Sequence, residues 1–166
     1  MKKIIWSVLC LFTITIISAG CSSSKSSTAV PLTTYALHQA ITENKWVFTA
    51  DYVMPQSGRS RATNGLYTMV ANADKISVQL PYFGRAYSGA DVLSGKGPLD
   101  FTSTDFNLDK QEKKEGEWRL LLKPNDYREV QSITMNFYTN GRASVDVLFT
   151  NHSPISFRGT ISLKQD

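Results

Sequence analysis

The stretch ITMNFYTNGRASVDVLF, residues 133–149, decides the fold class of this chain. Apolar residues occupy every second position on both sides of Asn140-Gly141, which is the pattern of two strands that each bury one face. Asn and Gly tolerate the positive φ values that a tight primed turn needs. The stretch therefore predicts an antiparallel β-hairpin that turns at Asn140-Gly141.

The period of two recurs through most of the remaining chain. The expected strands are Trp46–Tyr52, Leu66–Ala71, Ile76–Leu80, Phe106–Lys110, Glu117–Lys123 and Ile155–Leu163. Asn72–Asp74 is expected to join the second of these to the third, and the charged segment Lys113–Gly116 to join the fourth to the fifth. Polar residues such as Thr134 and Asp146 alternate with the apolar ones, which fits a sheet with one solvated face.

Only one segment has the period of a helix. Thr33 or Thr34 can cap a short helix that runs to about Asn44. Its buried stripe is expected to consist of Leu37, Ala40 and Ile41. We therefore expect a mainly β fold, an antiparallel sheet or partly closed barrel of about seven or eight strands with one short N-terminal helix. An α+β arrangement, in which the helix backs the sheet, is the alternative.

The N-terminus resembles the signal segment of a bacterial lipoprotein. Two lysines precede the apolar segment Ile4–Ile17, which is too short to cross a bilayer as a helix. The next residues, SAGC at 18–21, match the lipobox motif except that Ser18 stands where leucine is usual. Two alternatives stay open: an ordinary secretory signal that leaves Cys21 as a free thiol, or an uncut anchor.

The lipobox resemblance implies three parts. Residues 1–20 are the signal peptide, residues 21–31 are the lipidated Cys21 with a flexible Ser-rich tether, and residues 32–166 are a single β-rich domain. Acyl chains on Cys21 would hold the protein in a lipid bilayer, with a tether that reaches about 35 Å when fully extended. Ser22 and Ser23 replace the aspartate that signals inner-membrane retention, which favours the outer membrane, facing the periplasm.

Charge and motifs exclude several functional classes. The formal net charge of +4 falls to +2 without the two lysines of the signal, and no basic run follows, so we expect no nucleic-acid partner. The lipobox resemblance implies that Cys10 leaves with the signal and that Cys21 is acylated, so no thiol would remain for redox chemistry. His38 and His152 lack the neighbouring ligands of a metal site. We expect neither a metal nor another cofactor.

No catalytic motif is found in the sequence. There is no Gly-x-Ser-x-Gly nucleophile motif, and the lipobox resemblance implies that no free cysteine is left to act with a histidine. Carboxylates from distant strands can still form the acid and base of a glycan hydrolase. The candidates for such a pair are Asp91, Asp100, Asp105 and Asp109. We expect a protein that is not an enzyme and keep a cell-wall or glycan hydrolase as the least favoured alternative.

The segment LPYFGRAY, residues 80–87, opens a long glycine-containing loop, and such loops are often functional. With this segment, the lipobox, WVFTAD at residues 46–51 and Arg59-Ser60-Arg61, the chain resembles the Bacteroides-type lipoprotein family catalogued as domain of unknown function 4251 (DUF4251). The resemblance covers nearly the whole mature chain, including the C-terminal hairpins. It implies no activity, because the family brings none.

Six side chains in and near this loop are candidates for binding a partner: Tyr82, Phe83, Arg85, Tyr87, Arg59 and Arg61. The rings can stack on a sugar, peptide or aromatic ligand, and the arginines can grip a carboxylate or phosphate. In the structural alternative, the rings plug one end of the sheet. We favour a non-enzymatic envelope binding or accessory module for a protein, peptide or glycan; a carrier of a small apolar ligand in a barrel cavity is the alternative.

Replacing the lipidation residue tests the anchor. Cys21→Ser is expected to leave the domain folded and to release it from membranes, because acyl chains would be the only attachment. Fractionation of cells into membrane pellet and supernatant, followed by an immunoblot for chain length, measures both. A variant that stays in the pellet at unprocessed length would support the uncut anchor.

Overall fold

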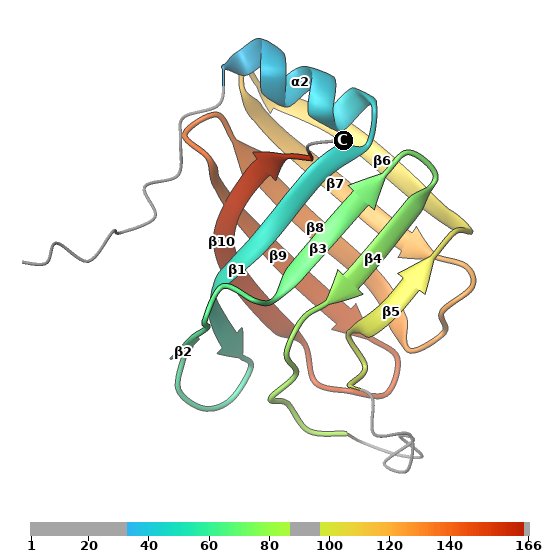
Figure 1. The fold of residues 1–166 in the computed structure, drawn as a ribbon. Helices are drawn as coiled ribbons and strands as arrows, with labels where there is room; N and C mark the ends of the chain where they lie inside the picture. The colour runs from blue at the N-terminus through green and yellow to red at the C-terminus, as the bar shows by residue number, and fades with distance from the viewer. Residues whose placement is uncertain (1–32, 87–96, 165–166) are drawn as a thin grey trace, which may run out of the picture.

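The computed structural model describes residues 33–86 and 97–164, which form one helix and ten strands (Figure 1). The elements are α2 Thr34–Thr42, β1 Lys45–Pro55, β2 Arg61–Ala62, β3 Thr68–Asn72, β4 Lys75–Gln79, β5 Asp100–Ser103, β6 Phe106–Lys114, β7 Glu117–Pro124, β8 Val130–Tyr138, β9 Arg142–Phe149 and β10 Ile155–Leu163. Within these ranges, no helix is long and apolar enough to cross a membrane. The predicted lipidation site Cys21, the tether and Tyr87 lie outside the described residues.

The strands form one antiparallel sheet, in the order β5-β4-β3-β1-β10-β9-β8-β7-β6, and β2 pairs with β1 beside this path. The mainly β prediction is confirmed, but the expected seven or eight strands were too few. The strands β2 and β5 were missed. The first has two residues, and the second buries only Phe101 and Ser103, so neither has an apolar alternation to recognise.

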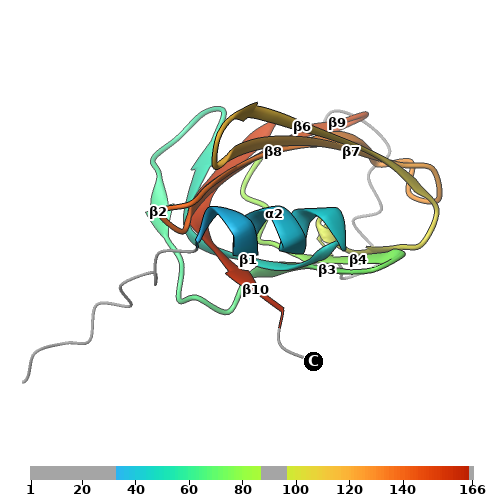
Figure 2. The ribbon, with the colours of Figure 1, turned by 90° about the horizontal axis from the view of Figure 1, so that it is seen from above.

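The sheet is curled into a half-barrel. β5 and β6 stand at opposite ends of the strand order, although only Thr104 and Asp105 separate them in the chain. The sheet must therefore curl until its two edges meet at this corner. Seen from above, β6, β7, β8 and β9 form one layer, and β1, β3 and β4 form the other (Figure 2).

A carboxylate fastens the corner. Asp126, between β7 and β8, accepts hydrogen bonds from Ser103 Oγ at 2.6 Å, from Thr104 N at 2.9 Å and from Asp105 N at 3.1 Å. These bonds, led by the one from Ser103, hold the pKa of Asp126 below its usual value. The loop after β7 is thereby tied to the turn that joins the two sheet edges.

The core lies between the two layers. Its largest fully buried side chains include Trp46 and Phe48 from one layer and Phe137 from the other, and the rings of Trp46 and Phe137 meet edge to face at 5.0 Å. A ligand-sized void would leave space for solvent beside the side chains that line it. Trp46, Phe48 and Phe137 each have an exposed fraction of 0%, so no such void lies next to them. The core is therefore densely packed around these side chains.

The helix α2 closes one end of the half-barrel (Figures 1 and 2). Its buried residues are the predicted Leu37, Ala40 and Ile41. Thr33 is the N-cap, and its Oγ1 accepts a hydrogen bond from Ala36 N at 3.1 Å. At the other end, Lys110 Nζ donates to the Thr42 carbonyl at 3.1 Å, and burial lowers the pKa of this lysine. The helix thus bridges the opening between the layers.

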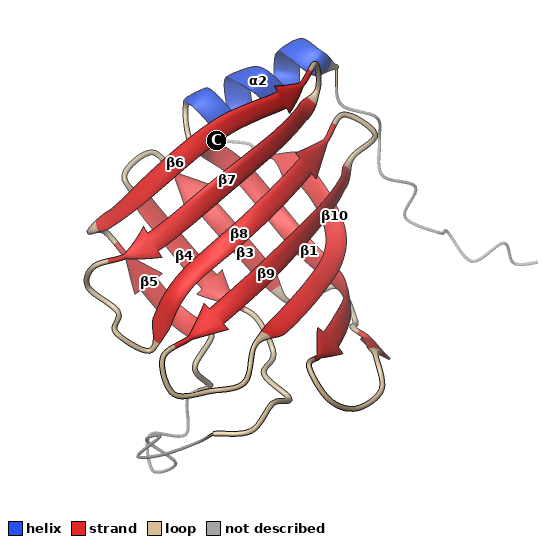
Figure 3. Cartoon of the chain, turned by 180° about the vertical axis from the view of Figure 1, so that it is seen from behind, coloured by secondary structure: helices blue, strands red, loops and turns tan. Residues whose placement is uncertain are grey.

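All three expected hairpins are present (Figure 3), but the turn predicted at Asn140-Gly141 was wrong in type. A primed turn would need a positive φ at both residues, but of Asn140 and Gly141 only the glycine has one, of 76°. Residues 139–141 form a three-residue loop, in which Gly141 N donates to Tyr138 O and Asn140 Oδ1 accepts from Arg142 N, both at 3.0 Å. The asparagine contributes its side chain to the turn, so a positive φ is not needed there.

One glycine lies where two strands approach closely. Gly159 of β10 faces the irregularity in β1 between Ala50 and Tyr52, and a Cβ on it would overlap the Thr49 carbonyl oxygen. Gly159→Ala is therefore expected to lower the free energy of unfolding by about 1–3 kcal/mol, because the backbones must move apart. Urea unfolding monitored by tryptophan fluorescence measures the change.

Gly97→Ala is the matched control, since a Cβ at Gly97 meets nothing within 4 Å. Equal urea midpoints for the Gly159 variant and the control would contradict the close approach of β1 and β10.

Candidate functional site

The described candidate residues belong to segments at the end of the half-barrel that lies opposite α2 (Figure 1). Here β2 lies against the far end of β1, the segment 80–86 follows β4, and the connection 150–154 joins β9 to β10. The outcome for the predicted residues differs from one side chain to the next.

Tyr82 is held by the protein itself. Its hydroxyl oxygen lies 3.0 Å from both Ser153 O and Ser153 Oγ, and 3.1 Å from Arg85 O. Its ring meets those of Phe149 and His152 edge to face, at 5.1 Å and 5.3 Å. These are the contacts expected of an aromatic plug, and they fix the start of the loop on the β9–β10 connection.

Ser153 completes a clasp that the sequence did not reveal. Arg85 N donates to Ser153 Oγ, and Ser153 N donates to Arg85 O, each at 3.0 Å. Gly84 fits between them because a Cβ there would overlap the Tyr82 hydroxyl and Ser153 Oγ. We call Tyr82, Gly84, Arg85 and Ser153 the clasp. It gives the segment 80–86 a fixed conformation.

Phe83 and Arg61 form the exposed pair of the site. The guanidinium carbon of Arg61 lies 4.8 Å from the centroid of the Phe83 ring, a cation–π contact. The ring is 43% exposed, and Arg61, in β2, is also exposed. Two segments that are distant in the sequence therefore present one combined surface.

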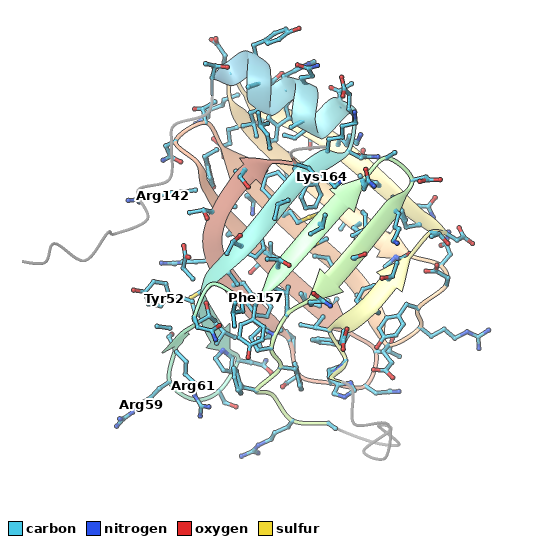
Figure 4. All side chains as sticks on the ribbon, viewed as in Figure 1. Tyr52, Arg59, Arg61, Arg142, Phe157 and Lys164 are labelled. Atoms are coloured by element: carbon cyan, nitrogen blue, oxygen red, sulfur yellow. The ribbon has the colours of Figure 1, made fainter. Side chains whose placement is uncertain are left out.

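Two further arginines lie close by in the chain. Arg59 precedes β2 and Arg85 ends the clasp, and both side chains are exposed. Figure 4 shows Arg59 and Arg61 at the same end of the molecule, directed outward. Within the described ranges, neither residue nor Arg85 forms an ion pair. We call Arg59, Arg61, Phe83 and Arg85 the arginine tip.

The electrostatic surroundings of the tip include one acidic group in β1. Burial raises the pKa of Asp51 above its usual value, and its backbone carbonyl accepts a hydrogen bond from Thr63 N at 2.8 Å. The positive surface of the tip comes from its three exposed arginines, which form no ion pair among the described residues.

The predicted carboxylate candidates are dispersed. Asp100 begins β5, Asp105 accepts a hydrogen bond from Asn125 Nδ2 at 2.8 Å in the corner turn, and Asp109 lies on β6. Asp91 lies outside the described residues. In the part of the chain that the structure describes, no three His, Cys, Asp or Glu residues are placed to hold a metal ion.

The two histidines have structural surroundings. His38 of α2 packs edge to face on Trp118 at 5.4 Å. His152 is 92% buried beside Tyr82 and Phe149, and its Nδ1 forms no hydrogen bond among the described residues. Its backbone forms an isolated bridge with Ala86, so this histidine helps to dock the loop.

Ser153→Ala is expected to loosen the clasp, because the Arg85 N–H and the Tyr82 hydroxyl each lose a partner. The loss corresponds to about 1–3 kcal/mol of stability, and trypsin is expected to cleave after Arg85 faster. Timed digestion followed by mass spectrometry measures the rate.

Ser156→Ala is the control for that experiment, since Ser156 Oγ donates to Asp146 on the outer surface at 2.6 Å. Cleavage after Arg85 at the same rate in both variants would show that the clasp does not hold the loop.

Comparison with known proteins finds a matching family and a similar crystal structure. Residues 33–161 match the family model described as domain of unknown function (DUF4251). The crystal structure of a DUF4251 family protein from Bacteroides eggerthii DSM 20697 is similar, with a TM-score of 0.54 and 14% identity, over 82% of this chain and 90% of that one. No curated protein matches the sequence. The family match runs from the cap of α2 into β10, so the chain belongs to the DUF4251 family.

Proposed function

We propose that this chain is a lipid-anchored envelope protein whose β domain is a non-enzymatic binding module. The arginine tip is the binding surface, and it recognises a carboxylate or phosphate group of a protein, peptide or glycan. The contact between Arg61 and Phe83 carries this proposal.

That contact prepares the arginine for a ligand. A guanidinium packed on an aromatic face keeps its planar edge free, and this edge can donate two parallel hydrogen bonds to a carboxylate or phosphate. The ring also restricts the Arg61 side chain, which reduces the entropy that binding must remove. The exposed face of Phe83 adds apolar contact area beside the charge.

The clasp supports the proposal because it fixes Phe83 from both sides. Tyr82 and Gly84, its neighbours in the chain, are held against Ser153. A binding surface is more selective when its residues are held in place before the ligand arrives. Tyr82 and Ser153 are thus positioning residues, and Phe83 and Arg61 are the contact residues.

The position of the arginine tip indicates which kind of partner it can reach. The predicted tether precedes Thr33, the cap of α2, and the arginine tip lies at the opposite end of the half-barrel (Figure 1). If Cys21 holds the chain to a bilayer, the tip can face away from that bilayer. This arrangement favours a periplasmic partner over the headgroups of the anchoring membrane.

The carrier alternative has less support. A carrier needs an internal apolar cavity, whereas residues from both layers, such as Phe48 and Phe137, are packed at 0% exposure. The hydrolase alternative also has less support, because Asp109 is the one carboxylate among the residues that line the hollow on the outer face of β6, β7 and β8.

Removing the exposed pair tests the proposed surface. Arg61→Ala with Phe83→Ala is expected to reduce binding of the full chain to isolated cell-wall sacculi, whose peptides carry free carboxylates, by at least about ten-fold. Binding is also expected to weaken with added NaCl, since exposed charges are screened. Co-sedimentation at graded sacculus concentrations measures both effects. The same measurement with phosphatidylglycerol vesicles in place of sacculi tests for binding to phosphate instead of carboxylate.

Arg142→Ala with Leu163→Ala is the matched control. Both residues are exposed. Arg142 begins β9 and lies away from Arg59 and Arg61 (Figure 4), and Leu163 ends β10, where it pairs with Trp46. Equal binding by the tip variant and wild type, or an equal loss in the control, would overturn the proposal. Melting curves of both variants establish that each is folded.

A further inference from the structure

A hollow lies on the outer face of the sheet, away from the arginine tip. It has a volume of about 230 Å³ and crosses β6, β7 and β8. Its lining residues are Asp109, Gln111, Arg119, Leu121 and Thr134. The strand register places Leu121 between Asp109 and Thr134, and Gln111 beside Arg119. We call this hollow the trough.

The polar side chains of the trough have no bonding partner among the described residues. Within the described ranges, the side chains of Asp109, Gln111, Arg119 and Thr134 form no hydrogen bond or ion pair. Some other side chains on the same face are paired: Asn136 Nδ2 donates to Ser144 Oγ at 3.2 Å, and Ser156 Oγ donates to Asp146. The four polar side chains of the hollow are therefore available to a ligand.

The mixture of groups favours a neutral ligand rich in hydroxyls. Asp109 can only accept hydrogen bonds when ionised, Arg119 can only donate, and the amide and hydroxyl of the other two can do both. A sugar hydroxyl can donate to the carboxylate and accept from the guanidinium. An anion would meet the Asp109 charge and a cation would meet the Arg119 charge, so a ligand with a single charge is disfavoured.

The apolar floor and the size agree with one sugar ring. Leu121 is partly buried at the centre of the lining, where it can pack against the C–H face of a pyranose. The volume is below the roughly 300–1,000 Å³ of sites that enclose a drug-sized ligand, so the trough suits one unit of a larger molecule. β6 is the last strand of the sheet, so adjoining units can extend past it.

We propose that the trough is a subsite for one neutral sugar ring of a glycan. The subsite is independent of the arginine tip, because its residues come from β6, β7 and β8 and those of the tip from β2 and the segments beside it. A chain with both sites can bind a glycan on its outer face while the tip holds an anionic partner.

The methyl NMR signals of Leu121 report on this subsite directly. The full chain in detergent micelles is titrated with methyl glycosides of N-acetylglucosamine, glucose, galactose and mannose. We expect at least one to produce a saturable shift at Leu121, with a dissociation constant of the order of millimolar, as befits a single exposed subsite. Asp109→Asn and Arg119→Lys are each expected to weaken it at least ten-fold.

Controls separate this subsite from general surface effects. Ser156→Ala on the same face and Arg61→Ala at the tip are expected to leave the sugar titration unchanged. The methyls of Leu120, which is fully buried, verify that each variant is folded. Three outcomes would overturn the proposal: no saturable shift with any sugar, an equal shift with the zwitterions glycine and alanine, or unchanged affinity in both trough variants.

Discussion

The short connection between β5 and β6 is the constraint on which the rest of the structure depends. Two residues, Thr104 and Asp105, join strands that end the sheet on opposite sides, so nine strands must curl to bring both edges to one corner. Asp126 stabilises that corner with three hydrogen bonds. The curl encloses the apolar faces of both layers, leaves the polar faces outside, and creates the opening that α2 covers.

The same curl determines where surfaces for a partner can form. Because the described core is densely packed around residues such as Phe48 and Phe137, a partner meets the loop end and the outer faces of the sheet. At the loop end, Ser153 clasps the segment after β4, so that Phe83 meets Arg61 from a strand only two residues long. On the outer face, the trough runs across three neighbouring strands, and four of its polar side chains have no partner among the described residues.

Regular elements were predictable because their signals are local. Thr33 as a cap, the stripe from Leu37 to Ile41 and the three hairpins follow from residue type and spacing. β5 escaped notice because Ser103, which bonds Asp126, occupies an inward position that is usually apolar. The turn at residues 139–141 was predicted in place but not in type, since an asparagine can serve a turn through its side chain or through its backbone.

The sequence by itself determined a mainly β domain with one N-terminal helix, and its lipobox predicts how that domain is tethered. It also indicated the loop that holds Phe83, since residues 80–87 are unusual in composition. Only the tertiary structure decided that Tyr82 is committed to the clasp, that Arg61 lies on Phe83, and that Asp109 and Arg119 share a trough. The physical reason is that alternation and capping act within a few residues, whereas these contacts join segments that only the closing curl of the sheet brings together.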